Sequence, residues 1–121
     1  MRKIVFALIT ATSLSIPAAA QAFEVVTDRD RFVALLDGRE LRLGLLGISL
    51  DVRPDGTILG RASGWDVSGS WTWRDGYFCR EMDWSGTPIP YNCQLVEVRG
   101  GEKIRFTVDR GAGDRATFNL R

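Results

Sequence analysis

Residues 71–93, WTWRDGYFCREMDWSGTPIPYNC, decide the fold of this 121-residue chain, because they hold both of its cysteines, three of its four tryptophans and both of its tyrosines. Trp71 and Trp73 alternate with polar residues, which predicts a strand with one face toward a core. Residues 74–76, Arg-Asp-Gly, are typical of a hairpin turn. Residues 85–90 contain one glycine and two prolines and predict a loop between the cysteines. The rest of the folded chain is expected to be arranged around this segment.

Alternation of apolar and polar residues extends from this segment over most of the chain. It predicts strands at residues 41–45, 48–52, 57–62, 66–73, 77–83, 92–98, 103–108 and 115–120. Short turns join most of these strands, which favours antiparallel neighbours. Gly44, Gly60 and Gly69 lie within predicted strands and suit the sharp coiling of a small barrel. The predicted fold is mainly β: a small antiparallel up-and-down barrel or sandwich of about eight strands.

One short N-terminal helix is expected before the strands, over residues 28–37. Thr27 is a candidate N-cap, and Asp28 and Asp30 suit the positive end of the helix dipole. Gly38 is a plausible residue just beyond the helix. The apolar positions at helical spacing are Phe32, Leu35 and Leu36. We expect this helix to close one end of the barrel or to lie across one face.

Residues 1–22 have the features of a secretory signal peptide. A basic start precedes an uncharged apolar run at residues 4–16, and Ala20-Gln21-Ala22 matches the small-x-small cleavage pattern. Cleavage would leave a single β-rich domain at residues 23–121 in the periplasm or outside the cell. The alternative, an uncleaved anchor, is disfavoured because a membrane span needs about 20 apolar residues.

Charge and cysteine content narrow the function classes. Removal of Arg2 and Lys3 leaves 14 basic against 15 acidic residues, without the basic excess of a nucleic-acid binder. Cys79 and Cys93 predict a disulfide in an oxidising compartment, which would contribute about 3 kcal/mol for a loop of about 15 residues. No histidine is present, so no metal site and no cofactor are predicted. The exported domain is expected to be a monomer with no membrane span.

Catalysis without histidine would have to depend on carboxylates. Glu81 and Asp83 share one face of a predicted strand, and paired carboxylates can hydrolyse glycosides. The simpler interpretation is a polar strand face with Arg80 as the partner of the two acids. A carboxylate hydrolase acting on envelope polymers therefore stays an alternative, and no catalytic residue is assigned.

Aromatic residues are the stronger candidates for binding. Trp84 and Tyr91 flank the predicted 85–90 loop, and these residue types are frequent binding anchors. The candidate binding residues are Trp84, Tyr91, Arg80, Glu81, Asp83 and Tyr77. The leading hypothesis is a small binding module, inhibitor-like or envelope-associated, that recognises a protein or a small ligand. A purely structural envelope protein, with the aromatics covering the core, is the other alternative. A hollow barrel would favour a small ligand, and a filled barrel would favour surface recognition.

The run GSWTWRDGYFCRE at residues 69–81, with YNCQ and GEKIRF further on, resembles a group of small exported bacterial proteins. Some members carry the label dihydrodipicolinate reductase, which implies a cytoplasmic, nucleotide-binding α/β enzyme. The predicted signal peptide, the β pattern and the lack of a dinucleotide fingerprint do not fit that label. A one-disulfide barrel of this size is also similar to periplasmic protease and lysozyme inhibitors and other calycin-like folds. Gly69-Ser70-Trp71 resembles their Gly-x-Trp element, although it lies mid-chain here.

Overall fold

The computed structural model describes residues 3–13 and 22–121. Residues 1–2 and 14–21, which include most of the predicted cleavage region of the signal peptide, lie outside the described residues. Residues 3–13 form no helix or strand and are exposed. Within the described parts of the chain, no helix has the length and apolar content needed to cross a bilayer.

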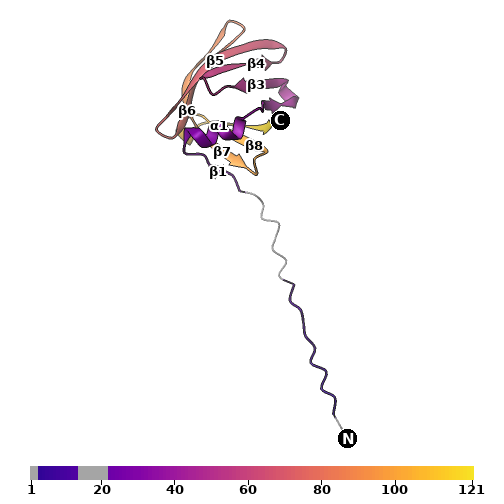
Figure 1. Ribbon diagram of the computed structural model, residues 1–121. Coiled ribbons are helices and arrows are strands. Elements are labelled where there is room, and N and C mark those ends of the chain that lie inside the picture. Colours follow the sequence, from indigo (N-terminus) through magenta and orange to yellow (C-terminus); the bar gives the residue numbers. More distant parts are fainter. Residues whose placement is uncertain (1–2, 14–21) are drawn as a thin grey trace.

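In the described residues, the strands form a closed eight-stranded antiparallel barrel with one additional strand and one α-helix (Figure 1). The barrel order is β7-β6-β5-β4-β3-β2-β9-β8, and pairing of β8 with β7 closes it. The additional strand, β1, pairs with β7 at Glu24↔Val98 and Val25↔Glu97. The elements are β1 (Glu24–Val25), α1 (Arg29–Leu36), β2 (Leu41–Leu43), η1 (Gly44–Leu46), β3 (Ile48–Val52), β4 (Thr57–Ala62), β5 (Trp65–Arg74), β6 (Tyr77–Trp84), β7 (Thr87–Arg99), β8 (Lys103–Thr107), η2 (Asp109–Gly111) and β9 (Arg115–Leu120).

Two-residue turns connect the long central strands. Ser63-Gly64, Asp75-Gly76 and Ser85-Gly86 each have positive φ at both positions, the conformation of a type I′ turn, whose twist matches that of the strands it joins. The predicted turn at Asp75-Gly76 is confirmed. The predicted loop at residues 85–90 is wrong, because β7 already begins at Thr87.

Two local predictions need correction. Leu45 was expected on a strand but lies in the 3₁₀ turn η1, where its side chain is 98% exposed. The N-cap of α1 is Asp28 and not Thr27. Asp28 has extended backbone, and its carboxylate accepts a hydrogen bond from the Arg31 N–H at 2.8 Å. The Thr27 carbonyl instead accepts a hydrogen bond from Trp73 Nε1 at 3.3 Å, so Thr27 anchors the chain to β5.

Helix α1 closes one end of the barrel through Phe32. The Phe32 side chain is completely buried, and its ring lies 5.1–5.3 Å from the rings of Trp71, Trp73 and Phe78. Phe106 adds a fourth aromatic contact at 6.3 Å. Such aromatic pairs contribute about 0.5–1.5 kcal/mol each beyond the area they bury. The expected core positions Trp71 and Trp73 therefore belong to a solid aromatic end of the barrel.

Candidate ligand-binding cavity

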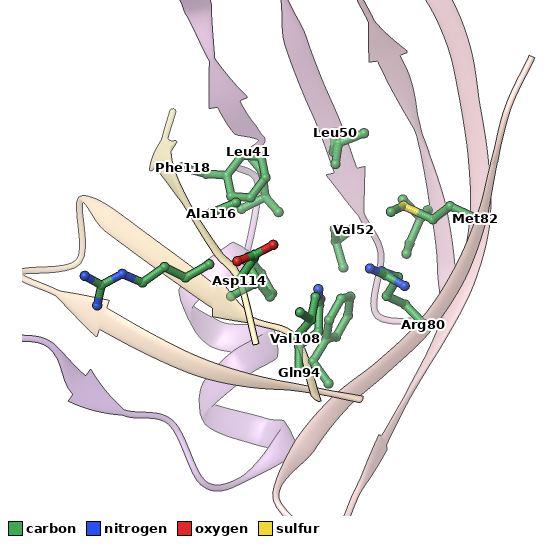
Figure 2. Close-up of a pocket in the computed structure, with 14 residues that line it drawn as sticks. Leu41, Leu50, Val52, Arg80, Met82, Gln94, Val108, Asp114, Ala116 and Phe118 are labelled. Carbon is green, nitrogen blue, oxygen red and sulfur yellow. The ribbon is translucent and has the colours of Figure 1, made fainter. Parts of the chain in front are cut away.

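The barrel is hollow beyond this aromatic end. A cavity of about 290 Å³ lies between the β3–β4 wall, β6 and the β8–β9 hairpin (Figure 2). Its apolar lining consists of Leu41, Leu50, Val52, Ile58, Phe78, Met82, Phe106, Val108, Ala116 and Phe118. Four polar residues complete it: Arg80, Gln94, Asp114 and Arg115. An apolar hollow with a few polar groups, close to the lower size limit of about 300 Å³, is typical of a small-molecule site.

Two inward-facing glycines help to explain why the barrel is hollow at this level. Gly60 alternates along β4 with Ile58, which lines the cavity, and Gly69 on β5 alternates with the buried Trp71. A Cβ at Gly60 would lie 2.1 Å from the Ser49 carbonyl oxygen, and one at Gly69 would lie 2.5 Å from that of Glu81. The strands approach too closely for side chains here, so neither position fills the interior.

A second apolar hollow of about 330 Å³ continues toward the end of the barrel opposite α1. It shares Leu50, Met82 and Phe118 with the first cavity. Trp84 lies at its rim, where the indole Nε1 donates a hydrogen bond to the Ala62 carbonyl at 3.0 Å. The two hollows therefore lie next to each other along the barrel interior, with these three residues in the walls of both.

Access to the cavity is explained by a short wall strand. β2 has only three residues and pairs with β9 at Leu41↔Leu120 and Arg42↔Asn119. The first half of β9 therefore extends past β2 without a strand partner on that side in the described chain. Ala116 and Asp114 are exposed there and still line the cavity. This part of the wall is the natural entrance.

Arg80 is a buried charged residue of the cavity wall. It faces inward with Phe78 and Met82, its alternate neighbours on β6, and its residue surface is only 8% exposed. Its Nη1 donates a hydrogen bond of 2.7 Å to the Pro90 carbonyl. Figure 2 shows Arg80 and Met82 on one wall, across the cavity from Asp114, Ala116 and Phe118.

A β-bulge in β7 supplies the carbonyl that holds Arg80. The strands pair at Arg80↔Asn92 and again at Met82↔Ile89, so two residues of β7 oppose the single Glu81 of β6. Pro90 lies in this bulge, where its missing N–H costs no ladder hydrogen bond. The Pro90 carbonyl is thereby available to fix the guanidinium at the cavity.

Among the described residues, Arg80 has no acidic partner. Within residues 3–13 and 22–121, no carboxylate forms an ion pair with it, and its Nε and Nη2 make no hydrogen bond to a described residue. In this part of the chain, every side-chain nitrogen or oxygen that is sealed from solvent has a hydrogen-bond partner. Because Nε and Nη2 have none, they must border accessible space. Burial lowers the pKa of the Arg80 guanidinium below its ordinary value, because desolvation disfavours the charged form.

Gln94 is the second polar group of the inner wall. It lies opposite Phe78 on β7, is 8% exposed and lines the same cavity as Arg80. No described residue forms a hydrogen bond with its side-chain amide, so the amide atoms keep some accessible surface. Because Gln94 lines the cavity, this amide is available to a ligand there.

The cysteines brace the wall that carries both polar groups. The sulfur atoms of Cys79 and Cys93 lie at disulfide distance, 2.11 Å, as the sequence predicts. The two residues are direct cross-strand partners between β6 and β7. Cys79 precedes Arg80 and Cys93 precedes Gln94, so the link fixes the spacing of the two strands at the level of the polar pair.

The structure separates the six predicted binding residues. Arg80 lines the cavity and Trp84 the second hollow. Tyr91 is 53% exposed on the outer surface, with its hydroxyl 3.4 Å from the Cys93 sulfur. Tyr77 lies beneath the guanidinium of Arg110 at 5.3 Å. Trp84 and Tyr91 therefore do not form one surface around a loop.

Glu81 and Asp83 face away from Arg80. Both alternate with the inward residues of β6, and neither lines the cavity. Glu81 is exposed, and the Asp83 carboxylate accepts a hydrogen bond of 2.7 Å from the Gly86 N–H. The expectation that Arg80 shares a face with these acids is wrong, because a strand directs successive side chains to opposite faces.

The sequence interpretation missed Gln94, Asp114 and Arg115 as cavity residues. A signal for Gln94 existed, because it alternates with Val96 and Val98 on a strand whose inward phase is apolar. No comparable signal marks Asp114 and Arg115, since the gap beside β9 depends on the pairing of β2. Comparison with protein-family models, curated proteins and solved structures finds no match to this chain.

Proposed function

We propose that this protein binds a small, mainly apolar molecule inside the barrel. The observation that carries the proposal is the apolar cavity of about 290 Å³ with two buried polar residues, Arg80 and Gln94, in its wall. A barrel built only as a scaffold would gain stability from larger side chains at this level, since unfilled apolar volume costs free energy. The second hollow of about 330 Å³ lengthens the available space.

The protein acts outside the cytoplasm in this proposal. The predicted signal peptide at residues 1–22 and the paired Cys79 and Cys93 support it. Mass spectrometry of protein recovered from the periplasm or medium should find Phe23 at the N-terminus and no free thiol. A chain that retains residues 1–22, or that carries free thiols, would contradict export with signal cleavage.

Binding is tested with an uncharged apolar fluorophore, N-phenyl-1-naphthylamine, titrated into the purified protein. Saturable binding of one molecule per chain is expected. Ala116→Trp should weaken it by about tenfold or more, because the larger side chain enters the cavity and each tenfold change corresponds to about 1.4 kcal/mol. Ala34→Trp is the matched control, since Ala34 is exposed on α1 and does not line the cavity.

The same titration can reject the proposal. Absence of saturable binding would exclude an apolar ligand of this size. Equal affinities of the wild-type protein and Ala116→Trp, with circular dichroism confirming that the variant is folded, would place the probe outside the barrel. Surface recognition of a protein would then become the better hypothesis.

A further inference from the structure

We propose that the ligand carries a carboxylate, which Arg80 binds inside the barrel with help from Gln94. This inference rests on the proposed function and names the chemical class of the ligand: an apolar molecule with one acidic head. The starting observation is that a buried arginine lines a mainly apolar cavity and has no acidic partner among the described residues. An uncompensated buried charge is costly, so a ligand anion would be strongly favoured.

The free edge of the guanidinium has the right shape for a carboxylate. Nη1 is engaged by the Pro90 carbonyl, which leaves Nε and Nη2. These two nitrogens lie on one edge of the planar group and can donate two parallel hydrogen bonds to the two oxygens of a carboxylate.

The protein itself uses this edge elsewhere. Arg105 binds Glu97 through Nε at 3.2 Å and Nη2 at 3.1 Å, one nitrogen to each carboxylate oxygen. Arg42 directs the same two nitrogens to Glu40. Arg80 thus presents inside the cavity the arrangement that these two arginines use toward acids, but without the acid.

Gln94 strengthens the anion site. It lies on β7 opposite Phe78, one inward position along the ladder from the Arg80↔Asn92 pair, and it lines the same cavity as Arg80. Its amide has two N–H donors, and a donor in the same wall would bind the anion more firmly than Arg80 alone. The disulfide-distance pair Cys79 and Cys93 holds the two strands in place, so the donors are positioned before the ligand enters.

The other charges at the cavity define where the acidic head must lie. Figure 2 shows the Asp114 carboxylate directed into the space from the wall opposite Arg80. Asp114 and Arg115 are both exposed at the entrance, where their opposite charges offset each other, and no described carboxylate pairs with the buried Arg80. The acid is therefore favoured deep at Arg80, with the apolar part of the ligand along Met82 and Phe118 toward the second hollow.

Three probes of equal chain length test this assignment by isothermal titration calorimetry at neutral pH: decanoic acid, decan-1-ol and decylamine. We expect the acid to bind wild-type protein about ten- to a hundredfold more tightly than the alcohol, as is typical of hydrogen bonds to a charged group. Arg80→Met should abolish this preference and leave the affinity for the alcohol within about threefold. Arg61→Met, which removes an exposed arginine from the outer face of β4, should keep the preference.

The outcomes separate this inference from the proposed function. If none of the probes binds, both proposals fail. If the acid and the alcohol bind wild-type protein equally, or Arg80→Met retains the preference for the acid, the barrel still binds apolar molecules but the carboxylate assignment is wrong. Preference for decylamine would make Asp114 the recognising group. A second readout needs no variant: the carboxyl carbon resonance of bound ¹³C-labelled decanoic acid should titrate at lower pH than that of the free acid.

Discussion

The two halves of the barrel interior are built from the same strands but have opposite character. At the α1 end, Phe32 fills the space between Trp71, Phe78 and Phe106 at ring distances of 5.1–6.3 Å. Toward the other end, the next inward-facing residue after Trp71 on β5 is Gly69, and the next after Phe78 on β6 is Arg80. The interior is therefore solid at one end and hollow, with a charge in its wall, in the rest.

This contrast indicates that one half of the interior stabilises the fold and the other half binds a ligand. Aromatic packing at the α1 end supplies stability, since buried aromatic side chains contribute most to core energetics. The hollow part lacks that contribution at Gly60 and Gly69, where the neighbouring strands leave no room for a side chain, and at Arg80, where a charged residue faces the interior. Such departures from good packing are expected where a protein binds something, and each can be tested by its effect on stability.

The largest effect is expected for Phe32→Ala. This substitution removes the completely buried side chain that holds α1 on the barrel, and truncation of a buried aromatic residue costs about 3–5 kcal/mol. Phe118→Ala is the comparison in the hollow part, where the side chain is half-buried and borders open space. Urea unfolding should show that Phe118→Ala lowers the free energy of unfolding by less than half as much as Phe32→Ala does. Equal losses would mean that the two halves contribute alike and that the division is wrong.

An intermediate effect is expected for Gly69→Ala. Its Cβ would meet the Glu81 carbonyl oxygen at 2.5 Å and the Met82 side chain at 2.7 Å, so β5 and β6 must separate, at a cost of about 1–3 kcal/mol. Gly44→Ala is the matched control, because no atom lies within 4 Å of its Cβ position, and a change within about 0.5 kcal/mol is expected there. Thermal unfolding of both variants measures the difference. Similar melting temperatures would contradict the close approach of the strands.

Alternation along the chain was enough to predict most of the strands that build the barrel and the core position of Trp71, whereas Trp73 is only half-buried against that core. It also could have placed Arg80 inward, because Phe78 and Met82 have the same phase. The expected polar face that combines Arg80 with Glu81 and Asp83 conflicts with this alternation. Adjacent residues of a strand lie on opposite faces.

The cavity itself could not be predicted from local sequence. Its hollow level depends on Gly60 and Gly69 facing the same interior, which requires the register between β4 and β5. Its entrance depends on β2 being only three residues long, because the backbone turns into η1 at Gly44. The Pro90 bulge likewise exists only as a mismatch between two strands. Strand register and barrel closure depend on pairing between strands that are distant in sequence, so the sequence of a single strand does not determine them.

The smallest change in stability, and the most informative, is expected for Arg80→Met in the absence of ligand. Removing the unpaired buried charge relieves a desolvation cost, while the Pro90 carbonyl loses its hydrogen bond, which costs about 1–3 kcal/mol. These terms oppose each other, so urea unfolding should give a free energy between the wild-type value and about 1 kcal/mol above it. If Arg80 serves instead to hold β6 and β7 together, the variant should lose the full cost of the unsatisfied Pro90 carbonyl, about 1–3 kcal/mol. A result near the wild-type value would mean that the residue contributes little to the folded state alone, which is what a group retained for a ligand should do.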